Sequence, residues 1–240
     1  MIIVLNRIQK TIYIFLLNVL FLFGCSAPFP KLSSSVLLLG LLNPNGILIS
    51  TDPNLALKYI FITTGTFSGQ LGAGTVGGGD TICANEKNAN FSALPGAGTD
   101  YKALIASQVV PIRRACNATA NCTNRAENSD WVLLPNQDYY LGTVASPIKT
   151  FTTNSAGIVV FPAPGLIVPM DPAAGTIWWT GLESGWLSSA DHCTNWTDGT
   201  AGAGFNNGQN GVGNTLSETA IAATFSDACD QPKHLVCVRQ

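Results

Sequence analysis

Charge is scarce in this sequence, and so is histidine. Charged residues make up 11% of the 240 residues, well below the roughly 25% of an average soluble protein. Exposed backbone and uncharged polar side chains must therefore supply much of the polar surface. The only two histidines are His192 and His234, and no Cys-x-x-Cys pair occurs. This composition argues against a zinc site of the usual ligand spacing.

Long apolar runs are also missing. The longest candidate, Thr11 to Phe23, is shorter than the roughly 20 residues that a membrane-spanning helix needs. It follows Arg7 and Lys10, which is where the apolar core of an export signal stands. We therefore interpret residues 1–24 as a lipoprotein signal peptide.

The end of this leader carries a possible modification site. Leu22-Phe23-Gly24-Cys25 resembles a bacterial lipobox, in which the cysteine thiol receives a diacylglyceryl group. Each buried CH2 of an acyl chain contributes about 0.8 kcal/mol to membrane binding. We predict lipidation at Cys25, a tether over residues 25–57 and a lipid-anchored protein at the cell surface, in the outer membrane. The alternative is an ordinary signal peptide with an incidental cysteine.

Cysteine, in contrast, is plentiful. Without Cys25, six of the seven cysteines remain, enough for three disulfides in any of about 15 connectivities. Such a number indicates an oxidising compartment. Loss of Arg7 and Lys10 with the leader leaves ten basic residues against 14 acidic ones, a formal charge of −4. That charge argues against a nucleic-acid partner.

The folded domain is predicted to span residues 58–240 and to contain both strands and helices. β-Branched and aromatic runs predict strands, and these runs lie at residues 59–64, 131–134, 157–161 and 176–181. One helix is expected to carry Cys83 with Asp80 or Thr81 as its cap, and a second is expected over residues 100–107. The Gly-x-Gly-x-x-Gly motif that begins at Gly72 lacks the βαβ context of a dinucleotide site.

The C-terminal quarter has the most distinctive pattern. A Trp-Thr-Gly segment begins at Trp179, and Cys193 is followed three residues later by Trp196. Residues 200–215 are rich in Gly and Asn, so we expect a long loop there. Residues 224–228 and 235–238 are expected to form a final hairpin that carries the last two cysteines, Cys229 and Cys237.

This order of motifs resembles the C-type-lectin-like fold and, more closely, the endostatin domain of collagen XV/XVIII. A bacterial lipoprotein with such a domain resembles the leptospiral endostatin-like (Len) family of surface lipoproteins. The resemblance covers residues 58–240. It implies an α+β domain stapled by disulfides, with a mixed, mostly antiparallel sheet, two helices and long loops. The pairings that it implies are Cys83–Cys237 and Cys193–Cys229, with Cys116–Cys122 as an additional local bridge.

Several properties of these relatives do not transfer. Endostatin binds zinc through an N-terminal histidine cluster, but no histidine precedes His192 here. Endostatin binds heparin through clustered arginines, whereas only Arg113 and Arg114 are adjacent in this domain. In the place of the calcium-binding Trp-Asn-Asp of sugar-binding lectins, only Asp227 is kept. We therefore predict no metal and no other cofactor.

The leading functional hypothesis is a surface-exposed adhesin, not an enzyme. The one suggestive catalytic cluster, Asp191-His192-Cys193, consists of adjacent residues, whose side chains rarely point the same way. The Len resemblance implies host matrix or plasma proteins as partners, such as laminin, fibronectin or the complement regulator factor H. A carbohydrate-binding lectin-like module and a structural envelope lipoprotein without a soluble ligand are the alternatives. The predicted ligand contacts are Trp186, Phe205, Asn206, Asn207, Asn210 and Asp227.

Overall fold

The computed structural model describes residues 52–72, 74–172, 175–201 and 206–240. The chain divides after residue 51 into two units, and the structure described below belongs to the second, residues 52–240. The predicted signal peptide, Cys25 and most of the predicted tether lie outside the described residues. The second unit begins with a 3-10 turn, η1 (Pro53–Ala56), immediately before the first strand.

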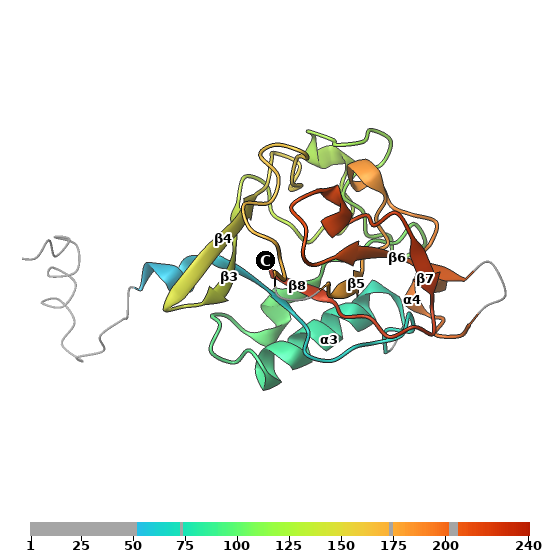
Figure 1. The fold of residues 1–240 in the computed structure, drawn as a ribbon, viewed down its shortest axis with the longest axis horizontal. Helices are drawn as coiled ribbons and strands as arrows, with labels where there is room; N and C mark the ends of the chain where they lie inside the picture. The colour runs from blue at the N-terminus through green and yellow to red at the C-terminus, as the bar shows by residue number, and fades with distance from the viewer. Residues whose placement is uncertain (1–51, 73, 173–174, 202–205) are drawn as a thin grey trace, which may run out of the picture. The chain divides into compact units, whose positions relative to one another are not determined.

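A five-stranded sheet forms the centre of this unit (Figure 1). Its strands, in spatial order, are β2 (Tyr101–Ala103), β8 (Val236–Arg239), β1 (Lys58–Ile62), β3 (Asp138–Thr143) and β4 (Ser146–Thr152). The pairing of β1 with β3 is parallel, and the other pairings are antiparallel. The strand predicted from residue 59 is confirmed as β1, because its β-branched and aromatic residues suit a buried central strand.

A second, smaller sheet has the order β5 (Ile177–Trp179), β6 (Asn207–Val212) and β7 (Ser226–Ala228), and all of its pairings are antiparallel. The strand predicted around Trp178 is confirmed as β5. Two other predictions are wrong. Six of the sixteen residues in the expected 200–215 loop form strand β6. Strand β7 pairs with β6 while β8 lies between β1 and β2, so no final hairpin forms. In β6, backbone pairing outweighs the turn-like composition of the segment. Residues of the two expected hairpin segments do form strands, but these strands pair with other strands and not with each other.

Helix α3 (Thr75–Ala89) carries Cys83 as predicted, but it begins before the expected caps, Asp80 and Thr81. A methyl group on Gly79 would lie 2.9 Å from Ile105 Cδ1 and 3.0 Å from Ala103 Cβ. Because Gly79 has no side chain, the helix can lie directly against the chain at β2. Tertiary packing therefore stabilises a helix in a glycine-rich segment whose composition is typical of a mobile loop.

The helix predicted over residues 100–107 is wrong. A 3-10 turn, η2 (Gly98–Asp100), leads into the edge strand β2, which pairs with β8. Tyr101 and Ala103 are buried and Lys102 is partly exposed, an alternation with the period of a strand. A run this short fits the period of a helix as well as that of a strand. Hydrogen bonding to the free edge of β8 selects the strand.

The strands predicted over residues 131–134 and 157–161 are also wrong, although most of these residues are buried. Both segments are irregular, and side chains together with local backbone turns satisfy their carbonyl groups instead of a neighbouring strand. Trp131 Nε1 donates to Gly157 O at 2.8 Å, and Trp186 Nε1 donates to Val159 O at 2.7 Å. The apolar runs therefore indicated correctly that these residues are buried, but burial here does not come with strand pairing.

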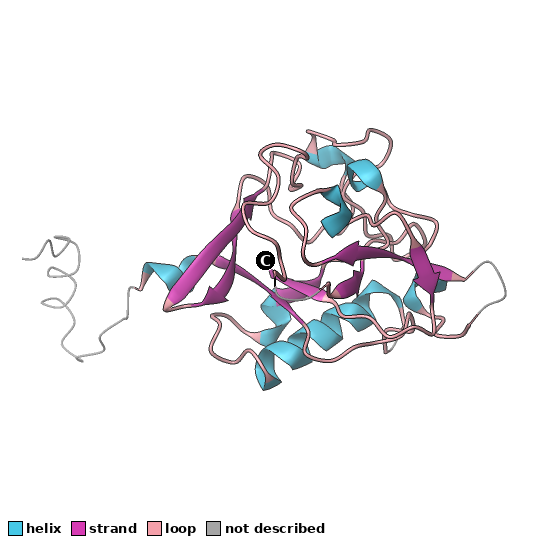
Figure 2. Ribbon diagram, viewed as in Figure 1, coloured by secondary structure: helices cyan, strands magenta, loops and turns pink. Residues whose placement is uncertain are grey.

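All five tryptophans act as anchors of this kind for irregular chain segments. Each is at most 3% exposed, and each indole N–H donates to a backbone carbonyl, as buried tryptophans usually do. The pairs are Trp131 with Gly157, Trp178 with Ala220, Trp179 with Phe67, Trp186 with Val159, and Trp196 with Ala106. The long loops (pink in Figure 2) are thereby fixed to the interior.

The strands of the large sheet separate two hydrophobic cores. Along β1, Tyr59 and Phe61 belong to one core and Ile60 belongs to the other, because successive side chains point to opposite faces. We call the first the helix-side core, since it includes Val76 and Cys83 of α3. The other, the loop-side core, is built mainly from irregular segments and contains Trp131, Trp178 and Trp186.

Three disulfides are present, and they match the predicted pairings. Cys83–Cys237 joins α3 to β8, Cys193–Cys229 joins the chain after β5 to the end of β7, and Cys116–Cys122 closes a local loop. The domain is therefore of the predicted general class, α+β with mixed sheets and disulfide staples. The remaining short elements are η3 (Arg125–Glu127), η4 (Ser184–Trp186), α4 (Cys193–Trp196) and η5 (Glu218–Ala220).

Candidate binding surface

The most exposed large apolar side chain among the described residues lies in a short loop after β2. Val110 is 79% exposed, and its neighbour Val109 is 51% exposed. The loop, residues 108–112, is closed by an antiparallel bridge in which Ser107 and Arg113 exchange backbone hydrogen bonds of 2.8 and 3.1 Å. We call residues 108–112 the valine loop. Its apolar side chains face solvent although its ends are fixed.

Side chains from other parts of the chain also hold the valine loop. Asn195 Nδ2 donates to Val110 O at 3.1 Å, and Asn195 Oδ1 accepts a hydrogen bond from the Ser107 hydroxyl. Gln108 Nε2 donates to Ser188 O at 2.5 Å. The loop is therefore fixed to two segments that lie about 80 residues further along the sequence. A loop held in one conformation loses little entropy when a partner binds.

Asn195 reaches the valine loop because it lies in a left-handed turn. The four residues of α4, from Cys193 to Trp196, have φ values of 49°, 51°, 60° and 62°. This conformation costs roughly 1–2 kcal/mol for each residue with a Cβ. The Cys193–Cys229 disulfide and the hydrogen bond from Trp196 Nε1 to Ala106 O hold the turn. Backbone strain of this kind is concentrated at functional sites.

His192 stabilises the same turn as a hydrogen-bond acceptor. Its Nδ1 accepts the backbone N–H of Asn195 at 2.8 Å, which requires that Nδ1 carry no proton. Burial lowers the pKa of His192, and this favours the neutral imidazole. Cys193 is in a disulfide. The Asp191-His192-Cys193 cluster therefore contributes a cap and a covalent anchor, without a free thiol.

Beneath the valine loop, Arg113 is engaged in a buried network. Its guanidinium contacts the carboxylates of Asp80 and Asp130, each at 2.8 Å, and also donates to Ala103 O at 3.2 Å. Burial alone would raise the pKa of Asp80, but the hydrogen bonds and charge of Arg113 hold it below its usual value. Arg113 is therefore not available for a heparin-like polyanion. The network joins the base of the loop to α3.

The predicted contact residues are dispersed, and two of them are buried. Trp186 is 1% exposed and packs against Trp131 and Phe161, so the prediction that it is an exposed contact is wrong. Asn210 is fully buried in the central strand β6. Asn206 and Asn207 are partly exposed, and Phe205 lies outside the described residues. A tryptophan between Gly185 and Leu187 resembles a loop tip in sequence, but its indole N–H fixes it inside.

Asp227 is poorly suited to a calcium site. Its carboxylate contacts Lys233 Nζ at 2.5 Å and accepts a hydrogen bond from Asn210 Nδ2 at 3.0 Å. The ammonium group of Lys233 thus already neutralises this carboxylate, whereas a calcium ion would need several further oxygen ligands around it. Within the described ranges, no group of three or more His, Cys, Asp or Glu side chains is arranged to hold a metal ion. Asp227 instead fixes the β7–β8 connection.

The sequence pattern does not predict the valine loop as a binding surface. Its signal is weak, because Val-Val-Pro-Ile at residues 109–112 reads as a short apolar run of the kind that usually enters a core. Pro111 is the one hint, since proline has no backbone N–H to offer a sheet. Within the part of the chain that the structure describes, no helix has the length and apolar character needed to cross a membrane.

Comparison with protein families finds one match, over residues 64–216, to a family described as "Protein of unknown function (DUF1554)". The matched region includes α3, both edges of the valine loop and the left-handed turn. A comparison with curated proteins finds no match.

Proposed function

The chain belongs to the DUF1554 family of proteins of unknown function, and we propose that it is a binding module that recognises another protein through the valine loop. One observation carries the proposal: Val109 and Val110 are 51% and 79% exposed on a loop that hydrogen bonds hold at both ends and in the middle. Exposed apolar groups on a rigid support form good interface anchors, because burial gains free energy while little conformational entropy is lost.

The proposed location and partners rest on the sequence. The lipobox at Cys25 supports a lipid-anchored protein displayed on the outer membrane, and the Len resemblance supports laminin, fibronectin or factor H as ligands. The disulfide arrangement supports the finer assignment to the C-type-lectin-like, endostatin-like fold, since Cys83–Cys237 encloses Cys193–Cys229 in the sequence. A surface low in charge suits recognition with little dependence on salt.

The test is the binding of the full-length protein to immobilised laminin, fibronectin and factor H, with and without a chelator. The variant V109S/V110S removes the two apolar anchors and should weaken binding about thirtyfold, since burial of each valine contributes about 1 kcal/mol at an interface. Its matched control is Ile167→Ser, which changes an apolar side chain that is 55% exposed elsewhere and should leave affinity unchanged.

Four outcomes would contradict the proposal. Unchanged affinity in V109S/V110S would exclude the valine loop as the contact surface. Equal losses in the double variant and in Ile167→Ser would indicate a non-specific hydrophobic effect. Absence of binding to all three ligands would remove the proposed partners and favour the structural envelope role. Loss of binding on addition of the chelator would instead favour a calcium-dependent lectin.

A further inference from the structure

A polar cavity lies where the two parallel strands β1 and β3 begin. It measures about 300 Å³ and is lined by Ala56, Leu57, Lys58, Asn136, Gln137, Asp138 and Tyr140. Because β1 and β3 are parallel, with Lys58 opposite Tyr139, the chain enters both strands from the same side and leaves a hollow between the two entering segments. This volume is at the small end of the range for ligand pockets.

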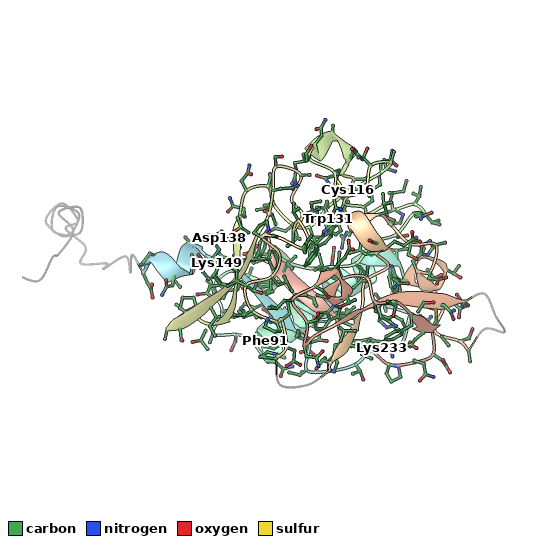
Figure 3. The ribbon with its side chains drawn as sticks, turned by 45° about the horizontal axis from the view of Figure 1, so that its top comes forward. Phe91, Cys116, Trp131, Asp138, Lys149 and Lys233 are labelled. Carbon is green, nitrogen blue, oxygen red and sulfur yellow. A yellow bond between two sulfur atoms is a disulfide. The ribbon has the colours of Figure 1, made fainter. Side chains whose placement is uncertain are left out.

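The one carboxylate in the cavity wall already has partners. Asp138 Oδ1 contacts Lys149 Nζ at 2.7 Å and accepts a hydrogen bond from Thr152 Oγ1 at 2.6 Å, and Asp138 and Lys149 lie side by side in Figure 3. Hydrogen bonds from Lys149 and Thr152 lower the pKa of Asp138, so it remains ionised and paired at neutral pH. It therefore adds little unbalanced negative charge to the cavity.

Lys58, in contrast, brings a positive charge without a partner. Its ammonium group makes no ion pair and no hydrogen bond within the described residues. Partial burial lowers the pKa of Lys58 and the nearby charge of Arg239 lowers it further, while the charge of Asp100 offsets part of this shift. An anion beside Lys58 would relieve both penalties, because an opposite charge favours the protonated amine.

The rest of the wall suits a ligand with hydroxyl groups and an apolar face. Asn136 and Gln137 supply amide groups, which can both donate and accept hydrogen bonds, and the Gln137 amide is positioned by its hydrogen bond to Asn136 O at 3.1 Å. Tyr140 supplies an aromatic ring that is partly exposed. Rings of this kind present an apolar surface together with a polar edge.

We propose that this cavity binds a monosaccharide that carries a carboxylate group, with the carboxylate at Lys58 and the hydroxyl groups at Asn136 and Gln137. Tyr140 lies against the C–H face of the sugar ring. The site is separate from the valine loop and does not depend on the proposed protein-binding function. The same acidic sugar could arrive free or as the end of a glycan chain.

Titration calorimetry of the full-length protein with D-glucuronate, D-glucose and acetate tests the proposal. We expect glucuronate to bind saturably, with glucose and acetate each at least tenfold weaker, because each lacks one of the two recognised features. Lys58→Met should weaken glucuronate binding about tenfold or more. Lys102→Met, which removes an equal charge outside the cavity, should not. Competition by a glucuronate-terminated oligosaccharide shows whether the cavity also accepts chain ends.

Thermal unfolding of each variant confirms that it is folded before binding is measured. Tyr140→Leu should also weaken glucuronate binding while the protein stays folded. Equal affinity for glucose and glucuronate would overturn the role of Lys58, and equal affinity for acetate would overturn recognition of a sugar. Absence of saturable binding, or unchanged binding in Lys58→Met, would overturn the site itself.

Discussion

The two hydrophobic cores on the two faces of the five-stranded sheet are held together by different means. The helix-side core is covered by α3 and carries the two disulfides that close long loops, Cys83–Cys237 and Cys193–Cys229. The loop-side core is covered largely by irregular chain, and its only disulfide spans a sequence separation of 6 residues. The long-range disulfides lie in the helix-side core, where Trp179 and Trp196 also donate indole hydrogen bonds. Among the described residues, the loop-side core has no long-range disulfide and depends on the indole N–H groups of its three tryptophans and on side-chain caps.

This difference explains how a domain with so much irregular structure keeps a defined surface. An irregular segment must satisfy each buried carbonyl and amide individually, and here tryptophan, asparagine and threonine side chains do so. Asn154, for example, donates to Cys122 O at 3.0 Å and accepts from the backbone N–H groups of Ala156 and Ile158. Each such contact is local, so its loss should affect one segment before it affects the whole domain.

The largest effect is expected from the long-range disulfide of the helix-side core. The variant C83A/C237A should lose about 5 kcal/mol of unfolding free energy in the chain-entropy model, because a loop with a sequence separation of 154 residues is no longer closed in the unfolded chain. The matched variant C116A/C122A, with a separation of 6, should lose about 2 kcal/mol. Urea denaturation at equal protein concentration measures both. Equal losses would show that the two cores do not differ in this way.

The next effect concerns the buried ion pair between Asp80 of α3 and Arg113 at the base of the valine loop. Asp80→Asn should cost about 3 kcal/mol at pH 7, because the Arg113 side chain, 3% exposed, would keep only Asp130, whose side chain is 59% exposed. The matched change Asp138→Asn affects a half-exposed pair and should cost less than about 1 kcal/mol.

The Asp80 contribution should also depend on pH in a defined direction. Since its folded-state pKa is lowered, the contribution is complete above the unfolded pKa of about 3.9 and is lost as the pH falls through the folded value. Calorimetric unfolding from pH 7 to pH 2 should therefore show the wild type and Asp80→Asn converging in acid. A constant difference across this range would exclude the ionised Asp80–Arg113 pair.

A smaller effect is expected from Trp186→Phe in the loop-side core. The substitution keeps an aromatic ring but leaves Val159 O without its 2.7 Å hydrogen bond, at a cost of about 2 kcal/mol. Hydrogen exchange should speed up first around residues 157–161, while the amides of β1 and β8 stay protected. Tyr140→Phe is the control, because its hydroxyl lies at 3.5 Å from Asp138, a weak contact. Uniform loss of protection would contradict local anchoring.

The smallest effect is expected at the valine loop. Val110→Ser should change the unfolding free energy by less than about 0.5 kcal/mol, because the side chain is 79% exposed and substitutions at such positions are usually nearly neutral. The urea midpoint and slope should both match those of the wild type. A destabilisation above 1 kcal/mol would mean that Val110 packs within the domain, and the binding proposal would lose its basis.

Sequence patterns predicted β1, β5 and the Cys83 helix, and the family resemblance implied the disulfide pairings that the structure contains. The patterns were wrong for segments that are buried without pairing as strands, and for one that pairs as a strand despite a loop-like composition. Residues 131–134 are apolar and buried like a strand, yet they find their hydrogen bonds in side chains. Asn207 to Val212 looks like a loop because of its Gly and Asn content, yet it is the central strand of its sheet. In both cases the hydrogen-bond partners come from other segments of the chain, and the local propensity of a segment carries no information about such partners.

The candidate surfaces show the same division. Cysteine number, low charge and the leader pattern are properties of the sequence itself, and from them follow the expected oxidising compartment, the three staples and the predicted lipid anchor. Only the tertiary structure buried Trp186 and Asn210 and exposed Val109 and Val110, because exposure depends on which segments cover a residue. The hollow between the entries to β1 and β3 likewise exists only once those two strands lie parallel.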